Sequence, residues 1–323
     1  MKPGKKITIV MFLPLFFFAM PTCVKDNASD FDGIPLEKKD SISLKLISAL
    51  NSDSIKATVT WLQSMGTRFS LADNHRLVAV SIRDKFKRNG YYTAYIDSFL
   101  LSNTWKSQNY TTWQYNVIAQ LYGSVHPDSL SIIGAHYDSN VRDGDPFKKA
   151  PGANDNGSGV AAMIEIARVM KLKNYVPGIS IQFVAFAAEE VGLFGSADYA
   201  AKLAYSGRPV SIMINNDMIA NVSNPNRLLW EVKIKHYSNS EDLSEKASAL
   251  CGKYIKLTPV IDTSGIKRSD SYSFFLKDYK AIYFESASTD YNYHTIGDLA
   301  VECNFNYCKL VTGLSAAMLV HSD

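Results

Sequence analysis

The stretch ISIQFVAFAAEEVG, residues 179–192, decides the fold of this chain. Its first nine residues form a nearly continuous apolar run, which is typical of a strand buried on both faces of a sheet. Such a strand needs helices on both sides, so the run predicts an α/β protein. Two glutamates, Glu189 and Glu190, follow where the strand is expected to end.

The rest of the chain supports this fold class. Apolar spacing predicts helices over residues 40–68, 77–86, 159–170, 194–203, 241–251, 269–276 and 307–319. Strands are predicted over residues 91–99, 115–122, 130–135, 179–187, 210–214 and 281–285. The first three are expected to pair as an antiparallel meander, and the later ones, alternating with helices, as parallel strands. We therefore expect one α/β domain with a mixed, mostly parallel central β-sheet flanked by helices on both faces.

Composition narrows the class of protein. The chain has 323 residues, 46% of them hydrophobic and 20% charged, which is ordinary for a globular protein with a large core. The formal net charge is only +3, and no basic stripe with interleaved aromatic residues is present. We therefore expect no nucleic-acid partner.

The amino-terminal residues carry an export signal. Lys2, Lys5 and Lys6 precede an apolar run over residues 7–20, which is short for a membrane-spanning helix. Cys23 lies just after this run, where a bacterial lipoprotein would carry its lipid. We expect an exported protein, attached to a membrane by lipidation at Cys23 or secreted in soluble form after Cys23 has left with the signal.

These features divide the chain into a signal peptide over residues 1–23, a flexible segment over 24–39 and a folded domain over 40–323. Three cysteines remain after residue 23: Cys251, Cys303 and Cys308. An exported protein permits a disulfide, and Cys303 and Cys308 are close enough in sequence to pair across a turn. The sequence does not determine the pairing.

Polar residues with metal-binding side chains follow several predicted strands. His136 and Asp138 follow the strand over 130–135, Asp217 follows the strand over 210–214, and His294 lies in the loop after the strand over 281–285. Each of them alone has an ordinary structural explanation. Because ligands bind outside the carboxyl ends of strands in α/β sheets, their joint placement indicates one site.

This residue set suits a pair of zinc ions and metal-assisted hydrolysis of an amide. Asp155 lies in the glycine-rich loop GANDNGSG and is the natural bridging carboxylate. Glu189 and Glu190 are adjacent, so in extended backbone their side chains point in opposite directions. One can then bind metal while the other takes a proton from water. Asp138 is well placed to orient the His136 imidazole.

In order and spacing, these segments resemble the M28 family of zinc metallopeptidases, from about Asn116 to the C-terminus, and WLQSMGTRFS (residues 61–70) resembles the family's N-terminal helix. The resemblance implies the phosphorylase/hydrolase-like fold of zinc aminopeptidases. It also implies an exopeptidase that hydrolyses the N-terminal bond of peptides with a free N-terminus, through a metal-activated water. The implied roles are one zinc on His136 and Asp217, a second on Glu190 and His294, Asp155 as bridge, Glu189 as general base and Asp138 as orienting residue.

Alternatives and one departure remain. Ser271 stands where many family members have a histidine, after the retained Asp270. A glutaminyl-peptide cyclotransferase with a single zinc has a similar ligand set, but it usually carries a tryptophan where Tyr293 stands. A carboxypeptidase of the same fold needs an arginine for the substrate carboxylate, for which Arg142 and Arg268 are available. A non-catalytic relative would have lost ligands, and none is missing.

Overall fold

Eight strands form one sheet in the part of the chain that the computed structural model describes, residues 1, 4 and 35–323. Their order across the sheet is β1-β2-β4-β3-β5-β8-β6-β7. The strands are β1 (Tyr95–Trp105), β2 (Gln108–Leu121), β3 (His126–His136), β4 (Ile179–Phe186), β5 (Val210–Asn216), β6 (Glu231–His236), β7 (Thr258–Ile261) and β8 (Ala281–Ser286). The predicted signal peptide and Cys23 lie outside the described residues.

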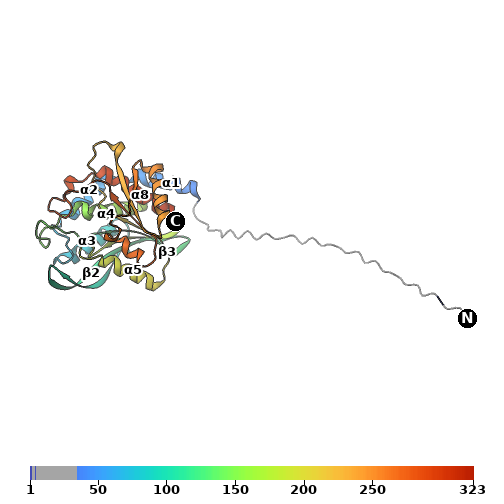
Figure 1. Ribbon diagram of the computed structural model, residues 1–323, viewed down its shortest axis with the longest axis horizontal. Helices are drawn as coiled ribbons and strands as arrows, with labels where there is room; N and C mark the ends of the chain where they lie inside the picture. Colours follow the sequence, from blue (N-terminus) through green and yellow to red (C-terminus); the bar gives the residue numbers. More distant parts are fainter. Residues whose placement is uncertain (2–3, 5–34) are drawn as a thin grey trace. The chain divides into compact units, whose positions relative to one another are not determined.

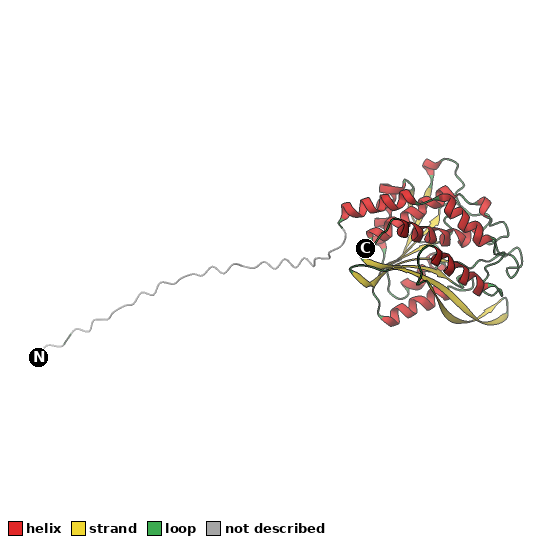
Figure 2. Cartoon of the chain, turned by 180° about the vertical axis from the view of Figure 1, so that it is seen from behind, coloured by secondary structure: helices red, strands yellow, loops and turns green. Residues whose placement is uncertain are grey.

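The sheet is mixed, and its centre is parallel, as expected. Strand β3 pairs in parallel with β4 and β5, and β5 pairs in parallel with β8. Antiparallel pairing occurs between β1 and β2, β2 and β4, and β6 and β8. Figure 2 shows the strands, in yellow, running between layers of helices.

The predicted meander is wrong at its third strand, because β4 lies between β2 and β3. The connection after β2 crosses the start of β4, where the amides of Ser124 and Val125 bond to the carbonyls of Pro177 and Gly178. A Cβ at position 123 would lie 2.5 Å from the Gly178 oxygen, so only glycine fits this crossing. The turn signal after β2 was correct, but it did not fix which strand became the neighbour.

Helices cover both faces of the sheet (Figure 1). One cluster of buried residues joins one face to residues of α1 (Leu36–Ala49), α2 (Ser52–Gln63), α3 (His75–Arg88), α4 (Gly159–Leu172), α6 (Glu241–Leu250) and α8 (Phe305–His321). A second cluster joins the other face to α5 (Phe194–Ser206) and α7 (Ser271–Phe275). Along β4, Phe183 and Ala185 belong to the first cluster and Val184 and Phe186 to the second, which confirms a strand buried on both faces.

Some element boundaries differ from the prediction. The helix expected over 40–68 is two helices, and Asn51 caps the second by accepting the amides of Asp53 and Ser54 at 2.7 and 3.1 Å. Helix α1 begins at Leu36, four residues before the predicted start at residue 40. Strands β1 and β2 extend to a two-residue turn at Lys106 and Ser107, which both have positive φ.

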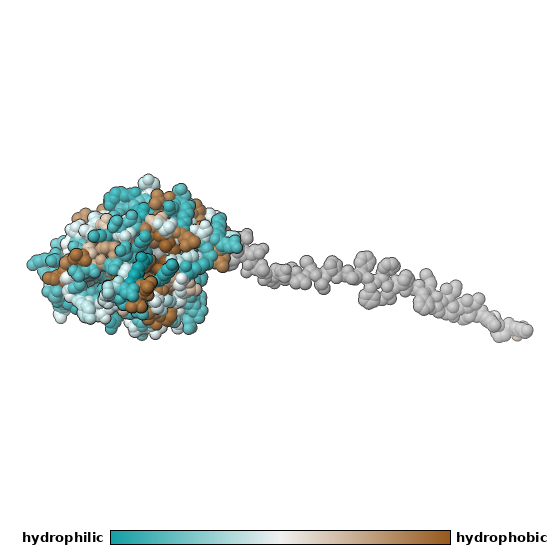
Figure 3. All heavy atoms as spheres, turned by 90° about the horizontal axis from the view of Figure 1, so that it is seen from above, coloured by the Kyte–Doolittle hydropathy of each residue, from teal (hydrophilic) through white to brown (hydrophobic). Residues whose placement is uncertain are grey.

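The described surface has no extended hydrophobic face in the view of Figure 3, where brown side chains occur in small groups among hydrophilic ones. None of the helices over the described residues is long and apolar enough to span a bilayer. Cys251, Cys303 and Cys308 are all free in the described structure, so the pairing considered for Cys303 and Cys308 does not occur there.

Candidate metal centre

The structure brings the predicted ligands together at the carboxyl ends of the central strands. His136 ends β3, Asp217 follows β5, and Asp155 precedes α4. The His136 Nε2 atom lies 3.3 Å from Asp155 Oδ1 and 3.4 Å from Asp217 Oδ1. These three side chains form one group that could hold a metal ion.

A second group shares Asp155. Its other carboxylate oxygen lies 3.1 Å from His294 Nε2, and Glu190 Oε2 lies 2.9 Å from the same nitrogen. The donor atoms of Asp155, Glu190 and His294 all lie within 4.8 Å of one another. Asp155 therefore faces both groups, one through each oxygen, as a bridging carboxylate would.

The charges of the site fit a cation. Burial, and next to it the charge of Asp155, raise the pKa of Glu190 to about 7. Burial opposes protonation of His294, but Asp155 and Glu190 raise the pKa of its imidazole to about 9. Glu190 Oε1 is buried without a hydrogen-bond partner among the described residues. Carboxylate and imidazole donors are ligands that zinc prefers, so the residues present fit this metal.

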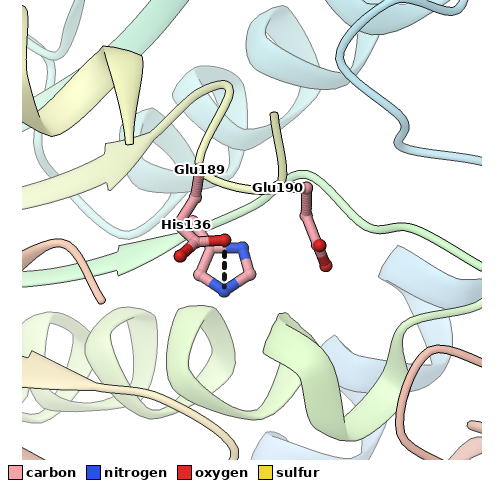
Figure 4. A group of neighbouring side chains, drawn as sticks. All are labelled: His136, Glu189 and Glu190. Atoms are coloured by element: carbon pink, nitrogen blue, oxygen red, sulfur yellow. Dashed lines mark ion pairs between the residues drawn. The ribbon is translucent and has the colours of Figure 1, made fainter. Parts of the chain in front are cut away.

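Glu189 and Glu190 differ in their access to the cavity, because Glu189 lines it and Glu190 does not. Figure 4 shows Glu189 reaching the His136 imidazole and Glu190 to one side of it. Donor atoms of these three residues also lie within 4.8 Å of one another, so they form a third group that could hold a metal ion. Glu189 Oε2 is 3.9 Å from His136 Nε2, and the side chain lines the cavity described below. Burial, the largest cause, raises the pKa of Glu189 well above its usual range. A carboxyl whose pKa is raised is a stronger base than an ordinary glutamate once it is ionised.

Asp138 has a wider role than the orientation of His136. Its backbone oxygen lies 3.1 Å from His136 Nδ1, whereas its carboxylate Oδ1 is 3.6 Å away. The two carboxylate oxygens instead accept the amides of Glu189 and Glu190, both at 3.1 Å. Ser70 donates a further hydrogen bond at 2.5 Å. Asp138 thus positions the loop that carries both glutamates.

Two buried residues that the sequence reasoning missed hold the loop of Asp155. Asp298 accepts the amide of Asn154 at 2.7 Å and that of Asp155 at 2.9 Å. The Arg68 guanidinium donates to the carbonyls of Tyr137, Pro151 and Gly152 at 2.7–2.8 Å. The only sequence signal for Arg68 was its place in WLQSMGTRFS. Asp298 gave none beyond lying four residues after His294.

The departure at Ser271 lies away from the cavity. Ser271 is fully buried, and its hydroxyl bonds to the Tyr237 hydroxyl at 2.8 Å. Asp270 is also buried, and burial raises the pKa of its carboxyl to about 7. Arg142 lies over the Tyr293 ring at 5.4 Å and does not line the cavity, whereas Arg268 does.

A cavity of about 580 Å³ opens beside the ligands. His136, Asp155, Glu189, Asp217 and His294 form one end of its wall. The volume is in the range of small-molecule sites, so a short peptide segment fits. The opening lets a substrate bond reach Glu189 and the two metal-binding groups.

Comparison with known proteins identifies relatives of this chain. The profile of peptidase family M28 matches residues 116–317. A protein of Pyrenophora teres f. teres (strain 0-1) described as a probable zinc metalloprotease is 32% identical over 223 residues, which are 63% of this chain and 46% of that protein. A probable leucine aminopeptidase of Arthroderma otae is 28% identical over 291 residues, 84% of this chain and 74% of its own length. This chain spans about half the length of the fungal metalloproteases it matches (46% and 50%).

Solved structures share the fold. The LapA aminopeptidase of Legionella pneumophila has a TM-score of 0.72 at 23% identity, with coverage of 87% of this chain and 74% of that one. A glutaminyl cyclase from an Acidobacteriales bacterium has a TM-score of 0.67 at 18% identity, with coverage of 84% and 94%. The chain belongs to peptidase family M28.

Proposed function

We propose that this protein is a zinc-dependent exopeptidase that removes the N-terminal residue of peptides. One observation carries the proposal: Asp155 offers one oxygen to the group of His136 and Asp217 and the other to the group of Glu190 and His294. This arrangement supports two zinc ions per chain with Asp155 between them. Relatives described as a zinc metalloprotease and a leucine aminopeptidase support the metal and the reaction class.

The residues divide the work of hydrolysis. When bound, the zinc ions polarise the substrate carbonyl and lower the pKa of a water molecule. Glu189 lines the cavity and lies close to His136 and Glu190, outside the two groups that share Asp155, and in this proposal it accepts the proton of that water as general base. Its raised pKa then lets it pass the proton to the amine that leaves. The Asp138 carboxylate holds Glu189 in place by accepting a hydrogen bond from its backbone amide.

Two other activities remain as alternatives. The cyclotransferase has a specific observation in its favour, since a glutaminyl cyclase shares the fold. A carboxypeptidase gains support from Arg268, which lines the cavity. The duplicated group around Asp155 favours the aminopeptidase over the single-zinc cyclotransferase.

The test is hydrolysis of aminoacyl fluorogenic amides by the zinc-loaded protein lacking residues 1–23. Each amide is offered with its α-amine free and acetylated. We expect cleavage of the free-amine forms alone, loss of cleavage with a chelator, and recovery on adding zinc. Cleavage of acetylated forms at equal rates would refute the aminopeptidase. Release of pyroglutamyl product from a glutaminyl peptide would establish the cyclotransferase instead.

A further inference from the structure

The cavity wall away from the metal ligands is charged. Lys233 and Lys235, from β6, line it together with Glu285, from β8. Glu285 forms ion pairs with both lysines: its Oε1 lies 3.2 Å from the Lys233 nitrogen and its Oε2 lies 3.0 Å from the Lys235 nitrogen. Asp262 lies 3.2 Å from the Lys235 nitrogen. The two lysines are thus balanced by two carboxylates.

Arg268 adds a positive charge that is not balanced. It lines the same cavity and is exposed to solvent, and no described residue forms an ion pair or hydrogen bond with its side chain. A Cβ added at Gly265 would lie 4.0 Å from Arg268 Cδ and 3.8 Å from the Lys235 nitrogen. Both cationic side chains therefore pass close to Gly265.

We propose that Arg268, with the lysine pair behind it, binds a carboxylate of the substrate. This inference rests on the proposed peptidase function and names its substrate class: peptides that place a carboxylate in this wall. The guanidinium presents N–H groups that match both oxygens of a carboxylate. The carboxylate comes either from an acidic side chain next to the cleaved bond or from the C-terminus of a very short peptide.

The wall disfavours other side chains. A cationic side chain near Arg268 would be repelled by its charge, and Glu285 is already held by two lysines. An apolar side chain would cover charged groups without replacing their hydrogen bonds, which costs free energy. Asp290 also lines the cavity, and the Asn154 side-chain amide at 2.7 Å and the Asn292 amide at 2.8 Å hold its carboxylate in place without neutralising its charge.

The experiment compares substrates that differ by one charge. The first arm measures kcat/KM for α-glutamyl and glutaminyl fluorogenic amides, and the second for glutaminyl-glycine and its C-terminal amide. We expect the charged member of one pair to be preferred by about tenfold, the size of a charge-assisted hydrogen bond. The arm that shows the preference identifies the source of the carboxylate.

Variants assign the preference to Arg268. Arg268→Gln should abolish it, and Arg268→Glu should invert it, so that the neutral member of the pair becomes the better substrate. Lys267→Gln removes the same charge from an exposed neighbour outside the cavity and should leave the preference unchanged. No preference in either arm, or a preference that persists in Arg268→Gln, overturns the inference.

A binding measurement separates this inference from the proposed function. Calorimetry with glutamic acid α-amide and glutamine α-amide measures recognition without requiring cleavage. Tighter binding of the glutamic acid amide, lost in Arg268→Gln, supports carboxylate binding by Arg268 even where no amide is hydrolysed. A different result would support the peptidase and refute carboxylate binding by Arg268. It is hydrolysis of both amides, equal affinity for both ligands, and no preference for the free dipeptide.

Discussion

Replacing Arg68 with lysine tests whether the N-terminal helical region holds the metal-binding loop. The guanidinium is fully buried and donates three hydrogen bonds to the backbone carbonyls of Tyr137, Pro151 and Gly152, which ties the end of β3 to the start of the Asp155 loop. A lysine keeps the charge, but its ammonium reaches about one of these carbonyls. Two buried carbonyls then lose their partner at a cost of about 1–3 kcal/mol each, so the free energy of unfolding should fall by about 2–6 kcal/mol. In a domain of this size that corresponds to a melting temperature lower by roughly 5–15 °C.

The assay has two readouts. Thermal unfolding of the metal-free protein gives the stability, and competition with a chromophoric chelator at 20–25 °C gives the zinc affinity. We expect the affinity to fall about 10–100-fold, as for other residues that position metal ligands. Arg76→Lys, at an exposed position of α3, is the matched control and should change neither readout. A lysine variant with normal stability and normal zinc affinity would refute the proposed support of the metal-binding loop by Arg68.

Four further predictions concern the site and the N-terminus. Glu189→Gln should bind zinc normally and lose at least 100-fold in kcat, whereas Glu190→Gln should lose zinc; atomic absorption and kinetics separate them, and equal zinc loss would contradict the division of roles. Asp298→Asn can accept only one of its two amide partners, so chelator competition should show about tenfold weaker zinc binding. The raised pKa of His294, about 9, means that protonation stabilises the metal-free fold below pH 6.5 and that this stability is lost as pH rises towards 9. Zinc must displace that proton, so calorimetry should show affinity rising over the same range, and a pH-independent affinity would exclude this linkage. We also propose export with lipidation at Cys23; palmitate labelling in a bacterial host should disappear in Cys23→Ala, and label retained in the variant would place the lipid elsewhere.

The central strands and the grouping of the site could be predicted because their signals are local. The run before Glu189 is apolar whichever strand lies beside it, and a polar residue at the end of a parallel strand reaches the same rim in any strand order. His136, Asp217 and His294 therefore met as expected. Strand order was not predictable in the same way, because it depended on a backbone crossing at Gly123 that no periodicity reports.

The residues that the sequence analysis missed either contact residues far away in the sequence or have charges that neighbouring side chains neutralise. Strand β6 was not among the predicted strands. It contains Lys233 and Lys235, and Lys235 is only 4% exposed because Asp262 and Glu285 pair with it. Arg68 works through carbonyl oxygens, which every residue has, so its role leaves no mark at the positions it contacts. Such roles follow from three-dimensional proximity and not from spacing along the chain.

The spread of the ligands along the chain has a consequence for folding. His136, Asp155 and Asp217 lie in the middle of the chain, and His294 comes from the loop after the last strand to be synthesised. A growing or partly folded chain therefore cannot complete the second metal group until β8 has joined β5. Zinc held by the second group therefore reports that β8 has joined the sheet, whereas the first group can form before the C-terminal part of the chain is in place.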